Sequence, residues 1–450
     1  MSINRTQALV VGGGPSGLSV AYALQGDTLV LEKEDRVGGL CRSVYHQGGV
    51  FDIGGHSFHT PHPEVYELVQ DLLAGELVSI QRDARVYTHG ALIPYPFQRY
   101  FDRIPDPEVV RACEEGLKNA NGRSAQAENF EEYIRLKFGD GIAEHFMLPY
   151  NRKLWARDIA KISCEWIPER VAAPKGEQEK FDTEGGKRKP LQPDTRVSYP
   201  PQGGYEEIYR LLASRVPAVE LNAQVARIDP VHRIAETRDG RRYQYEFLVS
   251  TMPLPLLVRV VDGVPLELIE LADRLEYMSL RVEFLLTRRP VESTLQRIYV
   301  ADPAIPPHKI ALNHNSSPHL RAQPHHAIMA EVSLSAEKEV RVEEIAPRTI
   351  EFLCSLGVLD SPEDILWQGH MDVKYAYPVY THQRPEQVRR IRAWMEELDI
   401  YTVGRFGDWE YINSDKCVHK GLALGQELRR RYPLPVDPAR ELPAAPGAVP

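Results

Sequence analysis

The sequence has few cysteines for its length, and none is arranged to hold a metal or a disulfide framework. Its 450 residues include five cysteines, no two of which form a CxxC pair: Cys41, Cys113, Cys164, Cys354 and Cys417. Such an odd, scattered set is typical of a reduced protein. We therefore expect a cytoplasmic chain without structural disulfides or a zinc site.

Long apolar runs and an excess of basic residues are also missing. No run approaches the roughly 20 apolar residues that cross a membrane, so we expect no membrane span. Residues 1–5 lead directly into a strand-like run, and we therefore expect no signal peptide. The formal net charge of −9 excludes a general role in binding nucleic acid, and any anionic ligand must be held by local cations.

The amino end of the sequence has the order strand, glycine turn, helix, strand, acid. The apolar run Ala8–Val11 is typical of a buried strand, a glycine-rich turn follows at residues 12–17, and residues 18–24 have helical apolar spacing. A second apolar run, Thr28–Leu31, stops at Glu32. This order is typical of the first βαβ unit of a dinucleotide-binding domain.

The residue types in the turn suit a bound dinucleotide. Gly12 permits the tight turn, Gly14 lets the backbone approach a pyrophosphate, and Gly17 lets helix and strand pack closely. The helix N-terminus offers free N–H groups to the phosphates. Glu32, twenty residues after Gly12, can accept hydrogen bonds from a ribose. We therefore predict a dinucleotide site here.

The segment after Glu32 favours FAD over NAD. A short charged stretch leads to Arg36 and then to Gly38 and Gly39, followed by Arg42. An acid followed by Arg-x-Gly-Gly resembles the pattern of FAD-binding flavoproteins of the amine-oxidase-like superfamily. The second glycine pair and the arginines add donors for the pyrophosphate. We predict FAD as the cofactor.

A further glycine pair, Gly54–Gly55, precedes three histidines. The pair lets the backbone approach a flat ligand. His56, His59 and His62 fall three residues apart, but the glycines before them, a proline among them and the lack of an acidic ligand at useful spacing disfavour a metal site. We expect no metal in this protein.

Apolar periodicity along the chain predicts an α/β fold: a discontinuous Rossmann-like FAD-binding domain, a mainly helical subdomain and a mixed β-sheet substrate domain. The run Tyr243–Ser250 is predicted as one strand, and its end returns to the flavin domain. The predicted boundaries are 1–90, completed by 200–260 and 395–432, for the FAD-binding domain, 98–175 for the helical subdomain, 261–394 for the substrate domain and 433–450 for a disordered tail.

Several shorter segments have a clear local pattern. Residues 84–93 alternate like an edge hairpin with His89–Gly90 at its turn, and prolines are predicted to keep residues 94–98 extended. A helix is predicted over 335–356 and a glycine-containing strand over 401–411. The segment 175–192 has almost no apolar residues and is predicted to be a mobile loop.

Over most of its length the sequence resembles UDP-galactopyranose mutases, especially those of the eukaryotic type, within the amine-oxidase-like superfamily of FAD proteins. The likeness follows the chain order in these motifs: Asp52–His56, Ile93–Gln98, Pro149–Asn151 with Trp155, Trp166–Ala172, Tyr377–Pro378, and Gly404–Gly407 with Trp409 and Tyr411. The early motifs are common to the superfamily, whereas Tyr-Pro-Phe-Gln and Trp-x-x-x-Arg-Val are narrower.

This resemblance implies a flavin-dependent isomerase that interconverts the pyranose and furanose forms of a nucleotide diphosphate sugar. In that family N5 of the reduced flavin attacks the anomeric carbon, so FAD must be reduced, by NADPH or another reductant. The implied catalytic residues are His56, Arg170, Tyr377 and Tyr411, with Arg170 holding the diphosphate. The implied substrate contacts are Tyr95, Phe97, Gln98, Asn151, Trp166 and Lys309. The predicted cofactor contacts are Gly12, Gly14, Gly17, Glu32, Gly38, Gly39, Arg42, Gly54, Gly55, Val225 and Arg405.

Five positions depart from the family pattern. The second arginine for the diphosphate corresponds to Lys309, a tyrosine to Ser316, an asparagine to Asp194, and an Asn-Gln pair to Asp415–Lys416. The cofactor half is thus intact, whereas the substrate half has changed. One alternative is therefore an FAD-dependent oxidoreductase of the same superfamily that acts on an amine, a sugar or a polycyclic substrate. Another is a flavin-binding protein without catalysis.

Overall fold

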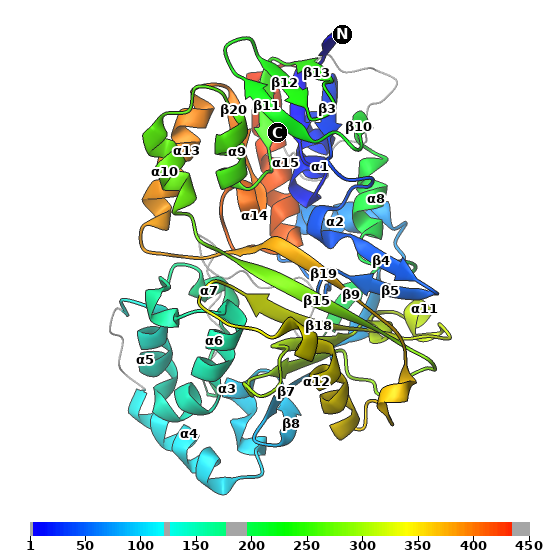
Figure 1. Cartoon of the computed structure of the whole chain (residues 1–450), viewed down its shortest axis with the longest axis vertical. Helices are drawn as coiled ribbons and strands as arrows, with labels where there is room; N and C mark the ends of the chain where they lie inside the picture. Colours follow the sequence, from blue (N-terminus) through cyan, green and yellow to red (C-terminus); the bar gives the residue numbers. More distant parts are fainter. Residues whose placement is uncertain (1–2, 121–126, 177–195, 434–450) are drawn as a thin grey trace.

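The structure is a computed structural model that describes residues 3–120, 127–176 and 196–433. Figure 1 shows two lobes, one with α1 and α15 against a small sheet and the other with a larger sheet beside a group of helices. All but the first residue of the predicted tail, nearly all of the loop predicted at 175–192, and Asp194 lie outside the described residues. No helix in the described ranges is long and apolar enough to cross a membrane.

A five-stranded parallel sheet forms the centre of the first lobe. Its order is β10-β3-β2-β14-β20, and every neighbouring pair is parallel. The strands are Ala218–Glu220 (β10), Thr28–Leu31 (β3), Ala8–Val11 (β2), Phe247–Ser250 (β14) and Ile400–Thr402 (β20). β2 and β14 are buried along their whole length, as expected in the middle of a parallel sheet. The predicted α/β class and the discontinuous nucleotide-binding sheet are confirmed.

Helix α1 (Pro15–Leu24) packs against the last helix, α15 (Ser414–Arg431). Glycines on α15 let the two backbones approach. A Cβ at Gly421 would lie 2.5 Å from the carbonyl oxygen of Ser16, and one at Gly425 would be similarly crowded. The carboxyl end of the described chain therefore holds the helix that follows the glycine turn.

A four-stranded sheet of order β1-β13-β12-β11 covers one end of this lobe: Ile3–Arg5, Arg242–Gln244, Ile234–Thr237 and Val225–Asp229. The single strand predicted over Tyr243–Ser250 is wrong, because the run divides between β13 of this sheet and β14 of the parallel sheet. At the division the N–H of Tyr245 donates to Arg233 O (3.0 Å) and that of Glu246 to Gln7 O (2.9 Å). Apolar spacing does not reveal such a change of partner, since both pieces are strands.

The second lobe contains a seven-stranded mixed sheet of order β19-β15-β18-β17-β16-β7-β8. Its strands are Ile365–Pro378 (β19), Tyr277–Thr287 (β15), Ala327–Leu334 (β18), Lys309–Leu312 (β17), Arg297–Val300 (β16), Ala84–Thr88 (β7) and Ala91–Pro94 (β8). The predicted hairpin at 84–93 is confirmed at the edge of this sheet. A domain boundary at residue 90 would cut through that hairpin, and the domain boundaries stay a prediction.

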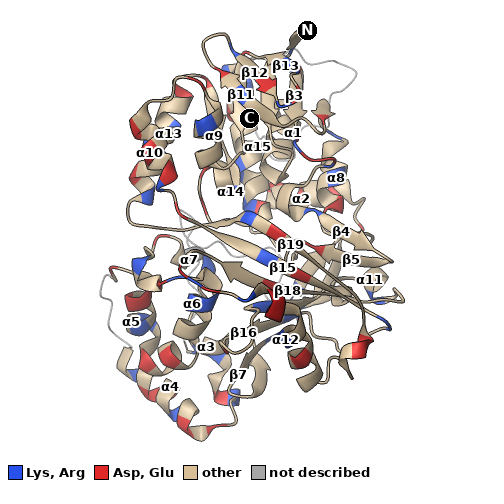
Figure 2. Cartoon of the chain, viewed as in Figure 1, with Lys and Arg blue, Asp and Glu red and all other residues tan. Residues whose placement is uncertain are grey.

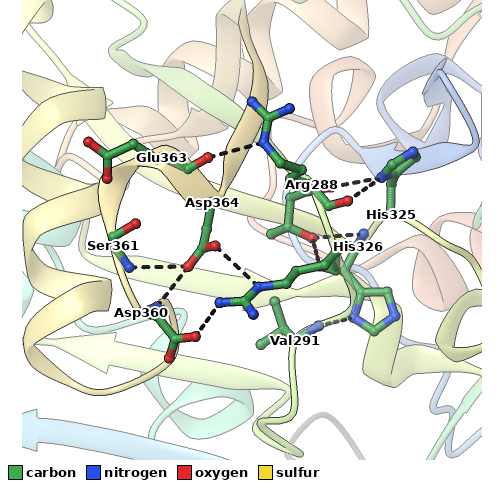
Figure 3. Close-up of polar contacts among 10 residues, drawn as sticks. Arg288, Val291, His325, His326, Asp360, Ser361, Glu363 and Asp364 are labelled. Atoms are coloured by element: carbon green, nitrogen blue, oxygen red, sulfur yellow. Dashed lines mark hydrogen bonds and ion pairs between the residues drawn. The ribbon is translucent and has the colours of Figure 1, made fainter.

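Polar contacts hold the turns at the end of β15 and the start of β19 in this sheet (Figure 3). Oδ2 of Asp364 accepts hydrogen bonds from the N–H groups of Asp360 (2.9 Å) and Ser361 (3.1 Å), which turn the chain into β19. Nε of Arg288 donates to Glu363 O (3.3 Å). The charges gathered here are thus engaged in holding turns.

A group of helices shares a core with the β7–β8 hairpin: α3 (Phe97–Tyr100), α4 (Pro107–Ala120), α5 (Phe130–Ile142), α6 (Leu148–Trp155) and α7 (Ile167–Arg170). Buried aromatic residues dominate this core, among them Phe97, Phe130, Trp155 and Trp166. The prediction that 94–98 is extended is wrong from Phe97 onward. Helix α3 begins there and turns that side chain into the core.

Two further local predictions are corrected. The helix predicted over 335–356 begins only at Val342 (α12, Val342–Ser355), after a tight turn at 335–338. The strand predicted over 401–411 ends at Thr402, because Gly404 takes a φ of +91° and starts a short helix, α14 (Gly404–Gly407). The other elements are Ser43–His46 (β4), Gly49–Asp52 (β5), Pro63–Leu72 (α2), Val78–Gln81 (β6), Arg196–Tyr199 (β9), Glu207–Ala213 (α8), Leu254–Val260 (α9), Leu266–Asp273 (α10), Pro318–Arg321 (α11) and Arg384–Glu396 (α13).

Candidate active site

The turn between β2 and α1 has the backbone conformation of a phosphate-binding turn. Gly12 has a φ of +108°, and Gly14 caps α1 without a side-chain hydrogen bond, so the first N–H groups of the helix lack a side-chain acceptor from the cap. A Cβ at Gly14 would lie 3.7 Å from Gly39 Cα, so the two glycine turns approach each other with bare backbone. A pyrophosphate fits such a wall because backbone N–H groups can reach it directly.

Glu32 is held beside this turn. The N–H of Gly13 donates to its Oε2 (2.7 Å) and the N–H of Glu34 to its Oε1 (2.9 Å). Each oxygen keeps a second lone pair, which can accept a hydrogen bond from a ribose hydroxyl. Arg42 donates to Gly39 O (3.0 Å) and lies 3.4 Å from the Glu34 carboxylate, so it positions the second glycine turn.

Gly17 and Val225 support this region from inside the lobe. A Cβ at Gly17 would collide with Gly12 O, so glycine is required where α1 crosses the turn. Val225 is buried at the start of β11, close to Ala223, whose N–H donates to Glu32 O (2.8 Å). The arrangement fits the adenosine and pyrophosphate half of FAD, and the individual contacts stay a prediction.

Gly54 and Gly55 have neighbours that explain why both are glycine. A Cβ at Gly54, where φ is +87°, would lie 3.3 Å from the carboxyl carbon of Glu331. A Cβ at Gly55 would lie 2.6 Å from Nε of Arg297. From the sequence, we predicted that this glycine pair lets the backbone approach a flat ligand. The structure adds that buried charged side chains occupy one side of these glycines.

Asp52 anchors the strand that leads into this loop. Its carboxylate is fully buried and accepts hydrogen bonds from Ser43 Oγ (2.6 Å), Tyr199 OH (2.7 Å) and the N–H of Tyr205 (3.1 Å). Burial raises the pKa of this carboxyl to about 6, although the hydrogen bonds act in the opposite direction. The network fixes the end of β5 and therefore the position of the loop that carries His56.

His56 lies against Tyr205, with ring centroids 5.0 Å apart and planes 9° apart. Burial lowers the pKa of His56 to about 3, and the nearby charges of Lys309, Arg405 and Arg297 act in the same direction. The imidazole is therefore neutral at pH 7. Its Nδ1 is buried without a hydrogen-bond partner in the part of the chain that the structure describes, so its hydrogen-bonding capacity is unused within these residues.

A cavity opens beside His56, and its empty space, with the open solvent at its mouth included, measures about 660 Å³. Its walls come from the loop after β5, from the facing strands β15, β17, β18 and β19, and from the segment around α14. The lining residues are Leu40, Ile53, Gly54, Gly55, His56, Leu280, Lys309, Glu331, Val373, Ala376, Tyr377, Arg405, Tyr411 and Asn413.

Tyr377 and Arg405 form one wall of this cavity. The Arg405 guanidinium lies 5.0 Å from the ring centroid of Tyr377 and donates to Ile412 O (2.6 Å) and Ala376 O (3.2 Å). Arg405 therefore holds the segment that carries Tyr411. Burial raises the pKa of Tyr377 to about 12, although Lys309 acts in the opposite direction, so its hydroxyl keeps its proton at pH 7.

Arg170 approaches the cavity from α7 behind Tyr411. It donates to Asn413 Oδ1 (2.7 Å) and to Tyr411 O (2.8 Å), and its guanidinium lies 4.3 Å from the Tyr411 ring centroid. Acidic and basic residues are interspersed along both lobes (Figure 2), so recognition of an anion depends on a local cation such as this one. The structure thus brings together His56, Tyr377, Arg405 and Tyr411 at the cavity, with Arg170 next to it.

The residues that the resemblance implies as substrate contacts do not all line the cavity. Lys309 lines the cavity. Tyr95 stacks on Tyr299 with centroids 4.6 Å apart, in a cluster of aromatic rings that the Arg82 guanidinium also contacts. Ser316, a suspected departure at the substrate, is buried and donates to Asn313 Oδ1 (3.2 Å) instead of lining the cavity described above.

The other four implied substrate contacts occupy the core of the helical group. Phe97 is fully buried and stacks on Phe146 with centroids 4.6 Å apart. The polar atoms of the others are engaged within the protein, in hydrogen bonds from Gln98 to Ala172 O, from Asn151 to Met147 O and from Trp166 to Ser163 O. None of these four lines the cavity described here, so a substrate role for them stays a prediction without support from its lining.

Two charged residues beside the cavity, Arg297 and Glu331, were not predicted from the sequence. Arg297 lies under Gly55 and donates to His56 O (2.8 Å). Glu331 accepts a hydrogen bond from the N–H of Gly55 (2.7 Å). A signal was present: each is a lone charge in a strand-like run, and buried charges are rare without a specific partner.

A possible metal cluster at the histidines needs one correction. The sequence analysis saw no acidic ligand at useful spacing, but Glu64 joins His62 and His419 in a group whose ligand atoms lie within 4.8 Å of one another. The two imidazole rings stack with centroids 3.9 Å apart, and His419 Nδ1 lies 2.5 Å from Glu64 Oε1. A stacked, hydrogen-bonded link between α2 and α15 accounts for this geometry.

Comparisons with known proteins agree with the fold and the predicted cofactor. The family model described as flavin containing amine oxidoreductase matches residues 15–305. The crystal structure of reduced UDP-galactopyranose mutase superposes with a TM-score of 0.85 at 26% sequence identity, over 95% of this chain and 94% of that one. The predicted likeness to that fold is confirmed.

Sequence similarity to curated proteins is partial. The coproporphyrinogen III oxidase of Mycobacterium tuberculosis is 26% identical over 275 residues, which cover 57% of this chain and 60% of that protein. Protoporphyrinogen oxidase 1 of Arabidopsis thaliana, a chloroplast protein, is 29% identical over 173 residues, which cover 36% of this chain and 32% of that protein. The chain thus spans less than two thirds of the length of these relatives.

Proposed function

The chain belongs to the family of flavin-containing amine oxidoreductases, and we propose that it is an FAD-dependent isomerase interconverting the pyranose and furanose forms of a nucleotide diphosphate sugar. FAD follows from the family, whereas its reduced working state and the nucleotide sugar belong to the proposal. NADPH or another reductant would supply the electrons.

The observation that carries the proposal is the pairing of a cavity at His56 with Arg170 beside its Tyr411 and Asn413 wall. A redox-neutral isomerisation of a sugar diphosphate needs a cation for the leaving diphosphate and a pocket for the sugar. The structural likeness to a reduced UDP-galactopyranose mutase over nearly the whole chain supports the same function.

Each side chain has a task in such a reaction. When bound in its reduced form, FAD supplies the nucleophile for the anomeric carbon. Arg170 balances the charge that develops on the diphosphate, and the protonated hydroxyl of Tyr377 donates a hydrogen bond to it. Neutral His56 offers Nδ1 to the ligand, while Arg405 keeps the segment of Tyr411 in place.

A second candidate is an FAD-dependent oxidoreductase acting on an amine, a sugar or a polycyclic substrate. The partial sequence similarity to coproporphyrinogen III and protoporphyrinogen oxidases favours it, as does the replacement of a diphosphate-binding arginine by Lys309. A flavin-binding protein without catalysis is the remaining alternative, and no specific contact favours it.

The test is an assay of the purified flavoprotein under anaerobic conditions, with and without reduction by dithionite. With UDP-galactofuranose as substrate, we expect UDP-galactopyranose to form only with the reduced protein, measured by anion-exchange chromatography. The oxidised protein is the matched control. Production of hydrogen peroxide from coproporphyrinogen III in air, without any sugar isomerisation, would establish the second candidate instead.

A further inference from the structure

Glu331 is a buried carboxylate whose two oxygens have different surroundings. It lies on β18 directly across from Lys309 on β17, and it is 1% exposed. Its Oε1 accepts hydrogen bonds from the N–H of Gly55 (2.7 Å) and from Nζ of Lys309 (2.7 Å). Its Oε2 has no hydrogen-bond partner within the described ranges, and Nε2 of His308 is 3.8 Å away. An anionic oxygen of this kind calls for a donor from a ligand or a water molecule.

The charges of this pair cancel inside the cavity. Burial works against the charged form of Lys309, but Glu331 and the phenols of Tyr377 and Tyr299 leave the pKa of Lys309 above its ordinary value. Lys309 is therefore protonated beside a carboxylate. Burial holds the pKa of His308 well below its ordinary value, so this histidine adds no positive charge at pH 7. A net neutral pair offers little attraction to a diphosphate.

The pair retains both kinds of hydrogen-bonding capacity. An ammonium group has three N–H donors, and one of those of Lys309 is used by Glu331. The other N–H groups of Lys309 can donate to a hydroxyl oxygen. Oε2 of Glu331 can accept a hydrogen bond from a hydroxyl O–H. Adjacent hydroxyls on a sugar ring present this combination of acceptor and donor.

Arg170 has the opposite character. Its donors are directed to an amide oxygen and a carbonyl oxygen, both neutral, at Asn413 and Tyr411. No ion pair joins its guanidinium to a carboxylate among the described side chains, although the buried carboxyl of Asp415 interacts with its charge. Arg170 and the Lys309–Glu331 pair thus differ in net charge, and Arg405 is a further cation of the cavity wall.

We propose that Lys309 and Glu331 form a neutral dyad that binds hydroxyl groups of the sugar, and that the diphosphate is held at Arg170. This inference rests on the proposed function in that it takes a nucleotide diphosphate sugar as the ligand. It assigns to Lys309 a role different from the phosphate contact that the resemblance implies for this position.

The test compares equilibrium binding of UDP, UDP-galactose and free galactose to the flavoprotein, followed by flavin absorbance. For Glu331→Gln and Lys309→Met we expect affinity for UDP-galactose to fall about tenfold or more, since a hydrogen bond to a charged group is removed. Affinity for UDP should change less than about twofold, because a net neutral pair contributes little attraction to a phosphate. Glu283→Gln, which alters a buried strand carboxylate that is not part of the cavity lining, is the matched control.

The outcomes distinguish failure of the dyad proposal from failure of the proposed function. If Lys309→Met weakens UDP as much as UDP-galactose, or if Glu331→Gln strengthens UDP binding, Lys309 acts on phosphate and the dyad is overturned. If the unaltered protein binds neither nucleotide, the proposed function fails, and galactose then decides the dyad alone. Galactose binding that both dyad variants lose supports it, and binding that they retain, or no galactose binding at all, refutes it.

Discussion

The guanidinium of Arg170 lies 4.3 Å from the ring centroid of Tyr411 and donates to the carbonyl oxygen of the same residue at 2.8 Å. One residue is therefore contacted through both its ring and its backbone. The contact joins α7 of the helical group to a segment that also lines the cavity. The position of this cation thus depends on two parts of the chain that are 241 residues apart.

Arg170→Ala should impair substrate binding while leaving FAD bound. We expect KM for the nucleotide sugar to rise, or turnover to be lost, with a penalty of about 2–4 kcal/mol for removing a charge-assisted contact. Flavin absorbance of the purified variant measures cofactor content, and steady-state kinetics measure the rest. A colourless variant would place Arg170 in the cofactor site instead.

Gly55→Ala should destabilise the protein and weaken cofactor binding. The added Cβ would lie 2.6 Å from Nε of Arg297, which would force apart the loop and the buried charges beneath it. Overpacking of this kind costs about 1–3 kcal/mol. Thermal unfolding and the FAD-to-protein ratio report the effect. Gly90→Ala, at φ +71° in an open hairpin turn where a Cβ meets no atom within 4 Å, adds backbone strain without a clash and is the control, whereas Gly55 has no positive φ.

Titration of His56 should lower the free energy of unfolding at acidic pH. Its pKa is lowered from 6.5 to about 3 in the folded protein, so the unfolded chain binds more protons between these values. The free energy of unfolding therefore decreases as the pH falls below 6.5, by at most about 1.4 kcal/mol per pH unit from this group. Urea titrations at a series of pH values should show a shallower slope for His56→Gln. An unchanged slope would mean that this imidazole does not titrate on unfolding.

Gly421→Ala should loosen α15 from α1. The new Cβ would lie 2.5 Å from Ser16 O, close to the first turn of the helix that follows the glycine-rich segment. We expect a lower melting temperature and weaker FAD binding, measured by thermal shift and by dialysis of the flavin. Gln426→Ala, on the exposed face of the same helix, should leave both unchanged. Equal effects of the two substitutions would show a general loss of helix stability.

Phe97→Leu should affect stability and spare catalysis. The ring is fully buried and stacks on Phe146, so we expect a loss on the order of 1–2 kcal/mol in the free energy of unfolding. KM for the nucleotide sugar should stay within about twofold of the unaltered value. A rise in KM without loss of stability would return Phe97 to the substrate site that the resemblance implies.

The first βαβ unit was predictable because its information is local. The turn and Glu32 lie within twenty residues of one another, and the spacing of Gly12, Gly14 and Gly17 is visible in the sequence itself. Apolar spacing also located the β7–β8 hairpin at the edge of the larger sheet. Patterns that lie within a short stretch of sequence can be recognised without knowledge of the tertiary structure.

The buried charges of the cavity were not predictable in the same way. The hydrogen bond between Gly55 and Glu331 spans 276 residues, and nothing near Glu331 in the sequence indicates that partner. The division of Tyr243–Ser250 between two sheets likewise depends on distant partners, Ile3–Arg5 and Ala8–Val11. Phe97 was assigned to a ligand because a motif specifies residue type and order, but not which way a side chain turns.

The parallel sheet that receives the dinucleotide has β20, residues 400–402, as its last strand. During synthesis the ribosome must deliver that strand, and then the helix that covers α1, before the sheet is complete. Assembly of the cofactor lobe therefore waits until β20 and α15 have been synthesised, after the strands of the other lobe have emerged. A nascent chain truncated before residue 400 should consequently fail to retain flavin, however intact its glycine-rich beginning.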